Sequence, residues 1–140
     1  MARTPTFKLA DIAQQVVGGF LLAGPFVVTE EVWTLARNMT WAHAAVTAAI
    51  VFAIGYGALY EADDDRDPDR EAEVAGVPLR FVSLMTISFG SVAVLAVTLT
   101  APSTFLPDLT TPERTEVTLR AISVGAIFSV VGAATADSVF

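Results

Sequence analysis

Four long apolar segments, separated by short polar ones, account for most of this chain. The stretches 12–29, 42–60 and 81–99 contain no Asp, Glu, Lys or Arg, and 117–139 contains such residues only near its two ends. A helix that crosses a bilayer needs about 20 mostly apolar residues, whereas a soluble amphipathic helix shows a polar stripe along one face. The pattern therefore predicts an all-α integral membrane protein.

We expect a single domain over 1–140, built as a bundle of four transmembrane helices. The predicted spans are 12–34, 42–60, 79–100 and 117–139, with an acidic loop at 61–78. The alternative is three spans, with the first or the fourth segment lying at the membrane interface. Pro102, Pro107 and Pro112 favour an extended third connection rather than a helical one.

Composition and charge support the membrane class. Charged residues make up 16% of the chain, against about 25% in typical soluble domains. The segment Glu61–Glu73 holds eight acids and two bases, so it carries −6 of the net charge of −7. Cysteine is absent. A soluble globule and a nucleic-acid partner both fit this composition badly, and no cofactor motif is visible.

The acidic segment invites comparison with a calcium loop, but it lacks the required glycine. An EF-hand needs Gly at the sixth position, and the run that starts at Asp63 has Pro68 there. We therefore predict no specific metal site. A hydrated acidic surface suits a high-salt cytoplasm, which indicates a halophilic source, and a small inorganic cation can associate weakly with such a run.

Lys and Arg positions predict the orientation, because acids contribute little to the positive-inside rule. One side of the predicted bundle holds five of these residues (Arg3, Lys8, Arg66, Arg70 and Arg80), and the other holds three (Arg37, Arg114 and Arg120). We therefore expect a multi-pass protein of the cell membrane with both termini in the cytoplasm. Trp33 and Trp41 flank the first connection as expected interfacial anchors, and Asn38 begins a glycosylation sequon on the outer side.

Small residues at helical spacing predict where helices pack, because they let backbones approach in lipid. The predicted packing positions in the second span are Ala45, Ala49, Ala53 and Gly57, and those in the fourth span are Gly125, Ser129 and Ala133. Two interpretations stay open: packing within one chain, or an interface between copies. Membrane lipid and a second copy of the chain are the expected partners.

Five residues are candidates for an ion pathway: Glu30, Glu31, His43, Asp137 and Pro25. Acids at membrane depth usually face protein or water and mark function. The short first connection brings His43 near the two glutamates, with Arg37 and Arg120 on the same side, and histidine titrates near neutrality. Pro25 removes the hydrogen bond to the Leu21 carbonyl, which with Gly18 and Gly19 predicts a deformable first helix. Interfacial ion pairing, a plain helix kink and a solvated Asp137 are the structural alternatives.

The first span resembles a known family in one stretch of about twenty residues. A Gly18–Gly19 pair, an internal Gly24–Pro25 and a closing Thr29-x-Glu31-x-Trp33 are similar to the first helix of an uncharacterised family of predicted integral membrane proteins common in haloarchaea. The resemblance implies a membrane protein from such a habitat and implies no mechanism.

Two functions fit the sequence. The first is a homo-oligomeric channel or transporter for a small ion or proton, indicated by a kinked helix that ends in carboxylates. The second is a non-transporting membrane subunit or sensor module that packs against a partner protein. An enzyme is not expected, because the chain has one His, no Cys and no phosphate-binding loop.

Overall fold

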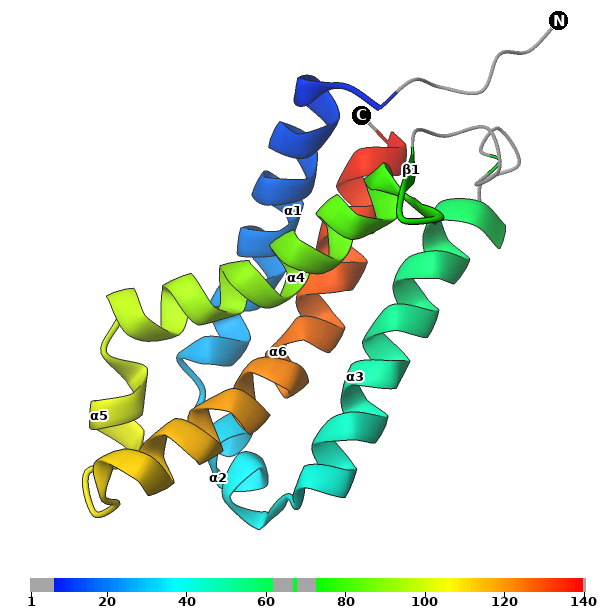
Figure 1. The fold of residues 1–140 in the computed structure, drawn as a ribbon. Coiled ribbons are helices and arrows are strands. Elements are labelled where there is room, and N and C mark those ends of the chain that lie inside the picture. The colour runs from blue at the N-terminus through cyan, green and yellow to red at the C-terminus, as the bar shows by residue number, and fades with distance from the viewer. Residues whose placement is uncertain (1–6, 62–66, 68–72, 140) are drawn as a thin grey trace, which may run out of the picture.

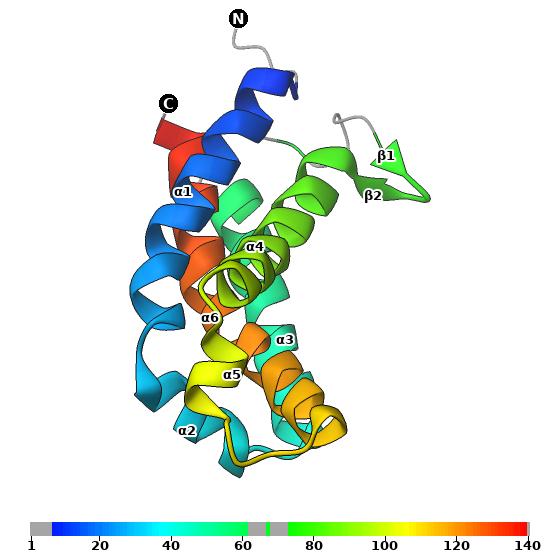
Figure 2. The ribbon, with the colours of Figure 1, turned by 90° about the vertical axis from the view of Figure 1, so that its left-hand side faces the viewer.

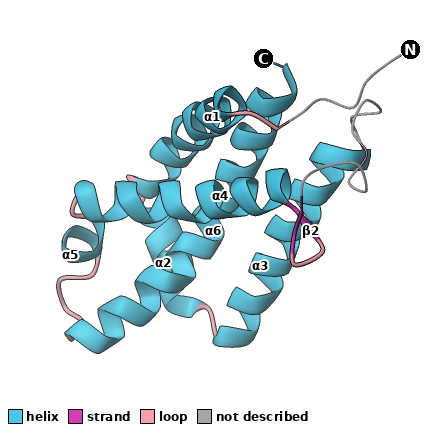
Figure 3. Ribbon diagram, turned by 45° about the horizontal axis from the view of Figure 1, so that its top comes forward, coloured by secondary structure: helices cyan, strands magenta, loops and turns pink. Residues whose placement is uncertain are grey.

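The computed structural model describes residues 7–61, 67 and 73–139, and within these ranges the chain is almost wholly helical (Figures 1 and 3). The elements in chain order are α1 (Leu9–Val27), α2 (Glu30–Asn38), α3 (Trp41–Tyr56), the π-helical η1 (Gly57–Glu61), β1 (Glu73–Val74), β2 (Val77–Pro78), α4 (Leu79–Thr98), α5 (Ala101–Phe105) and α6 (Thr111–Val139).

Four helical stretches are long and apolar enough to cross a membrane: Leu9–Val27, Trp41–Glu61, Leu79–Thr98 and Thr111–Ser138. The predicted all-α bundle of four transmembrane helices is therefore confirmed. The predicted acidic loop falls largely on residues 62–66 and 68–72, which lie outside the described residues.

Helix α6 is the centre of the bundle. It runs between α1 and α3 while α4 crosses it, and it contacts all three as well as α2 (Figures 1 and 2). In its most apolar stretch 56% of the residues are buried, compared with 22–28% in the other three spans. Its 29 residues correspond to about 44 Å at 1.5 Å per residue, longer than the hydrocarbon core is thick.

The first span ends earlier than predicted, at Val27 rather than at position 34. Pro25 lies inside α1 and cannot donate a backbone hydrogen bond, and the helix stops two residues later. The chain then turns at Thr29, whose hydroxyl donates to the Pro25 carbonyl over 2.6 Å, and α2 begins at Glu30. Glu30 and Glu31 thus open a separate short helix instead of closing the first span.

The prediction that Trp33 is an interfacial anchor is wrong. Its side chain is 2% exposed, and its indole Nε1 donates to the Val27 carbonyl, one of the last in α1, over 2.9 Å. The ring therefore caps the end of α1 from within the apolar core. Trp41 is 52% exposed and lies beneath the Arg120 guanidinium, 5.4 Å from it, in a cation–π contact.

The three prolines of the third connection predicted an extended segment, but part of this connection is helical. Helix α5 contains Pro102 in its first turn, where a missing N–H is tolerated, and α6 begins at Thr111 rather than at position 117. Thr110 and Glu113 cap the start of α6: the Glu113 carboxylate accepts from the Thr110 N–H over 3.0 Å.

In the second connection, a two-residue hairpin between β1 and β2, with positive φ at Ala75 and Gly76, leads into α4.

Candidate functional site

Arg80 and Asp137 form a buried ion pair at one end of the bundle. This end, here called the terminal end, holds the start of α1, the start of α4 and the finish of α6 (Figure 1). Arg80 Nη1 lies 2.7 Å from Asp137 Oδ1, and the two side chains are 1% and 0% exposed. Removing one member of such a pair typically costs about 3–5 kcal/mol, because the other charge stays buried without compensation.

Each charge lies at the end of its own helix where the helix dipole opposes it. Arg80 is in the first turn of α4 and Asp137 in the last turn of α6, whereas cations favour C-termini and anions favour N-termini. In the ion pair, however, the Arg80 cation lies at the C-terminus of α6 and the Asp137 anion lies at the N-terminus of α4, where each charge is favoured by the dipole of the other helix. Neither residue is explained by the stability of its own helix, and their contact joins α4 to α6.

Gln15 and Ser83 extend the pair into a hydrogen-bonded network. Gln15, in the second turn of α1, is 0% exposed, and its Nε2 donates to Asp137 Oδ2 over 3.0 Å. The Ser83 hydroxyl, one turn along α4 from Arg80, donates to Gln15 Oε1 over 2.7 Å. The network therefore joins the three helices α1, α4 and α6 through buried and partly buried polar side chains.

Asp11 links the network to the surface. Its side chain is 20% exposed, and its Oδ2 lies 3.4 Å from Arg80 Nη2, the guanidinium nitrogen next to the one that faces Asp137. The same carboxylate oxygen accepts from the Lys8 backbone N–H over 2.8 Å and so caps α1. Arg80 also lies over the Phe7 ring, 5.0 Å from its centre. The guanidinium is thus shared by two carboxylates, one buried and one partly open to solvent.

A second polar layer lies deeper in the bundle between the same three helices. The hydroxyls of Ser91 and Ser129 are 2.8 Å apart, and Ser129 Oγ donates to the Gly19 carbonyl over 3.1 Å. Both serines are buried. Buried polar side chains therefore continue from the terminal end toward the middle of the bundle.

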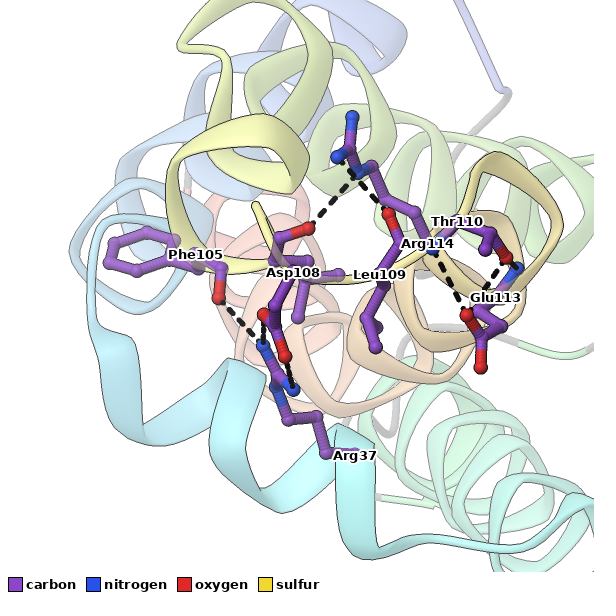
Figure 4. Close-up of polar contacts among 8 residues, drawn as sticks. Arg37, Phe105, Asp108, Leu109, Thr110, Glu113 and Arg114 are labelled. Atoms are coloured by element: carbon purple, nitrogen blue, oxygen red, sulfur yellow. Dashed lines mark hydrogen bonds and ion pairs between the residues drawn. The ribbon is translucent and has the colours of Figure 1, made fainter.

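The opposite end of the bundle, here called the loop end, is closed by a surface ion pair (Figure 4). Arg37 of α2 donates to both carboxylate oxygens of Asp108, over 3.0 and 2.6 Å, and to the Phe105 carbonyl. The hydrogen bonds from Arg37 lower the pKa of Asp108 to about 2, and the same contact raises the pKa of Arg37. Arg114 donates to the Leu106 carbonyl, so α2, the third connection and α6 are held together.

The predicted outer constellation does not assemble as one cluster. Among the described residues no ion pair or hydrogen bond joins Glu30, Glu31 or His43 to Arg37 or Arg120. His43 Nδ1 accepts from the Thr40 N–H over 3.0 Å and caps α3. Glu30 and Glu31 are exposed and line a shallow pocket on α2 with Thr34 and Leu35.

Of the other predicted pathway residues, Pro25 is exposed on α1, whereas Asp137 is a member of the buried network. Its burial excludes the alternative of a solvated carboxylate. Gly18, predicted to loosen the first helix, instead packs against Gly132 of α6.

The predicted packing positions divide between the two spans. Ala45, Ala49 and Ala53 lie on the exposed face of α3, and a Cβ on Gly57 would meet no atom within 4 Å. In α6 the three positions are buried: a Cβ on Gly125 would stand 2.7 Å from Val92, Ser129 contacts Ser91 and Gly19, and Ala133 is 0% exposed. The interpretation of packing within one chain thus describes α6 and not α3.

Sequence reasoning missed Arg80, Gln15, Ser83 and Asp11. Arg80 was counted only as a charge for orientation, although an arginine within an apolar span is itself a functional signal. Gln15 is a weaker signal, because one amide in an uncharged stretch does not reveal its partner. Among the described residues, no group of three or more His, Cys, Asp or Glu side chains is placed to hold a metal ion.

The family model "Putative integral membrane protein (DUF2391)" matches residues 2–139 of the chain. Searches of curated proteins and of solved structures gave no match. The matched range includes all four spans and every residue of the buried network, and it agrees with the resemblance of the first helix to an uncharacterised membrane family. The chain therefore belongs to this family of integral membrane proteins.

Proposed function

We propose that the protein moves a small ion or a proton across the membrane, through the polar side chains between α1, α4 and α6. The observation that carries the proposal is the buried pair of Arg80 and Asp137. Ionisable residues inside membrane spans are expensive and rare, and they mark ion pathways, proton relays and related sites. Apolar side chains in a buried pair's place are often equally or more stable, so stability alone does not account for the pair.

The polar layer formed by Ser91 and Ser129 supports a pathway rather than an isolated cluster. It lies between the same three helices, and it includes the Gly19 carbonyl of α1. Polar groups at two levels along one three-helix contact support a pathway for a moving ion or proton.

Oligomeric state and orientation in the membrane, both predicted from the sequence, are part of the proposal. Four spans with few connecting residues bury little surface alone, so we propose that the protein works as a homo-oligomer. From the Lys and Arg distribution we propose that both termini, and with them the terminal end, lie in the cytoplasm. The acidic segment supports a cell adapted to high salt. In this arrangement Asp11 faces the cytoplasm, and the site performs transport and no enzymatic reaction.

A second candidate function is a non-transporting subunit or sensor that packs against a partner protein. It is favoured by the exposed small residues Ala45, Ala49 and Ala53 on α3, a face that another membrane helix can approach closely.

The test is ion flux into liposomes that contain the purified protein, measured separately for H⁺, Na⁺ and K⁺. The proposal expects flux for at least one ion, lost in Asp137→Asn and kept in Asp108→Asn. Asp108 is a matched control because it is also paired with an arginine, but outside the spans. A correctly folded protein that passes none of the three ions would contradict transport and favour the partner-binding role.

A further inference from the structure

The geometry of Arg80 separates the roles of its two carboxylates. Nη1 faces the fully buried Asp137 and Nη2 faces the partly exposed Asp11, at 2.7 and 3.4 Å. A planar guanidinium offers donors on both sides, so the two contacts are made together without competition for one N–H. Among the described residues, two carboxylates therefore share one cation.

This sharing changes the consequence of neutralising Asp137. In an isolated buried pair, loss of the carboxylate charge would strand the arginine, at a typical cost of about 3–5 kcal/mol. Here Asp11 keeps a charge next to the same guanidinium. Asp137 can therefore lose its charge while Arg80 remains compensated.

Gln15 and Ser83 accommodate either charge state of Asp137. At present the Gln15 amide donates to Asp137 Oδ2 and accepts from Ser83. When Oδ2 carries the proton, rotation of the amide by half a turn would let Oε1 accept a hydrogen bond from the Oδ2 hydroxyl and let Nε2 donate to the Ser83 oxygen. A hydroxyl both donates and accepts, so neither state leaves a buried polar group of these three without a partner.

The space between the carboxylates is already filled by a cation. Arg80 and Asp137 are 1% and 0% exposed at the side chain, and Gln15 is 0% exposed. A metal ion would have to displace the guanidinium and bring its own ligands into this closely bonded group. A proton needs no such space, because it forms part of the Asp137 carboxyl group itself.

We propose that the species handled at this site is a proton, which Asp137 binds at Oδ2 while Arg80 stays paired with Asp11 and the Gln15 amide rotates. The inference rests on the proposed transport function and names its substrate. The proton arrives from the aqueous phase next to Asp11, converts the Asp137 carboxylate to a carboxylic acid, and leaves when that acid ionises again. No other bond is made or broken.

Other charged and titratable groups lie at the same end of the bundle. The described residues at this end of the elements packed against α6 include Lys8 and Asp11 on α1, Arg80 on α4, Tyr56 on α3, and Tyr60 and Glu61 in η1. Tyr60 is buried and Glu61 is exposed. Variants at Asp11 and Asp137 separate their titration from that of these neighbours.

The first measurement is ion selectivity in liposomes. We expect H⁺ flux, reported by a pH dye inside the vesicles, with no Na⁺ or K⁺ flux under the same gradients. Asp137→Asn should lower H⁺ flux by about a hundredfold, the scale on which positioned proton-transfer groups act. Flux of Na⁺ or K⁺ without H⁺ would overturn the proton assignment and leave the transport function standing.

The second measurement is infrared difference spectroscopy of the wild-type protein in lipid, from about pH 4 to about pH 9, a range that covers buried carboxyl groups. We expect a carboxylic-acid band that shifts with labelled aspartate and is missing in Asp137→Asn. A glutamine amide change should accompany it and be lost in Gln15→Leu but kept in Gln14→Leu. If Asp137 binds a proton but no liposome assay shows flux, the transport function is contradicted and the proton-binding inference stands.

Asp11→Asn keeps the test informative even if Asp137→Asn fails to fold. Without the second carboxylate, Arg80 loses a partner that stays charged when Asp137 binds a proton, so the pH dependence of the Asp137 band should differ from that of the wild type. A band at the same pH in Asp11→Asn, or no aspartate band at any pH in the wild type, would overturn the inference.

Discussion

Gly18 of α1 and Gly132 of α6 touch so closely that a Cβ on Gly18 would collide with the Gly132 carbonyl oxygen. Gly18 lies one turn from Gln15, and Gly132 lies between Ser129 and Asp137 on α6. The contact therefore sets the spacing of the two helices at the height where their polar side chains meet. The glycine pair and the buried network are parts of one helix–helix contact.

Gly18→Ala should destabilise the protein by about 1–3 kcal/mol, the usual cost of overpacking, because backbone atoms of α6 cannot yield as a side chain does. The matched control is Gly24→Ala in the same helix, where a Cβ meets nothing within 4 Å. It should be neutral or slightly stabilising, since alanine favours helix. Thermal unfolding in detergent compares the two, and equal melting temperatures would contradict the close contact.

The ion pair of Arg37 and Asp108 should make stability at the loop end depend on acid pH. Hydrogen bonds from Arg37 lower the pKa of Asp108 from about 3.8 to about 2, so the folded state binds this proton less readily than the unfolded state. The contribution is therefore complete above about pH 4 and is lost as the pH falls through about 2.

Thermal unfolding measured over this acid range should show a steeper loss of stability in the wild type than in Asp108→Asn. Arg37→Gln should flatten the profile in the same way, because it removes the donor that shifts the pKa. A wild-type profile parallel to those of both variants would contradict the assignment.

Orientation can be read from single cysteines, since the natural chain has none. With both termini in the cytoplasm, Asp65→Cys in the acidic segment should react with an impermeant reagent only after the membrane is opened. Position 65 lies outside the described residues. Pro107→Cys, in the connection at the opposite end, should react in intact cells. The reverse pattern would show that the positive-inside argument chose the wrong side.

The two small-residue stripes predict different consequences for large substitutions. Gly125→Leu should destabilise the single chain by about 1–3 kcal/mol, because its Cβ would press on Val92. Ala49→Leu on the exposed face of α3 should leave that stability unchanged and weaken association between copies. Cross-linking in membranes, together with thermal unfolding, checks both. Unchanged association in Ala49→Leu and Ala53→Phe would show that this face of α3 contacts lipid and not a second copy of the chain.

Hydropathy was sufficient to predict the four spans, because membrane crossing depends on length and composition, which are visible in the sequence. It did not predict which way a polar side chain points. Arg80 and Asp137 are 57 positions apart, and only the packing of α4 on α6 brings them together. Trp33 was misplaced for a related reason: its ring is apolar enough for an interface, but the turn after Pro25 directs it inward.

Glu31, one of the pathway residues predicted from sequence, and Asp137, which the structure favours, can be compared in a single assay. Glu31 is exposed in the first turn of α2, where a carboxylate stabilises the helix by about 0.3–1 kcal/mol through the dipole. Glu31→Gln should therefore lose about that amount and keep ion flux in liposomes, with Glu30→Gln behaving alike. Asp137→Asn should lower flux by about a hundredfold, because it removes the buried charge that faces Arg80. If Glu31→Gln stops flux and Asp137→Asn does not, the pathway begins at the acidic pocket on α2, and the buried pair only fastens α4 to α6.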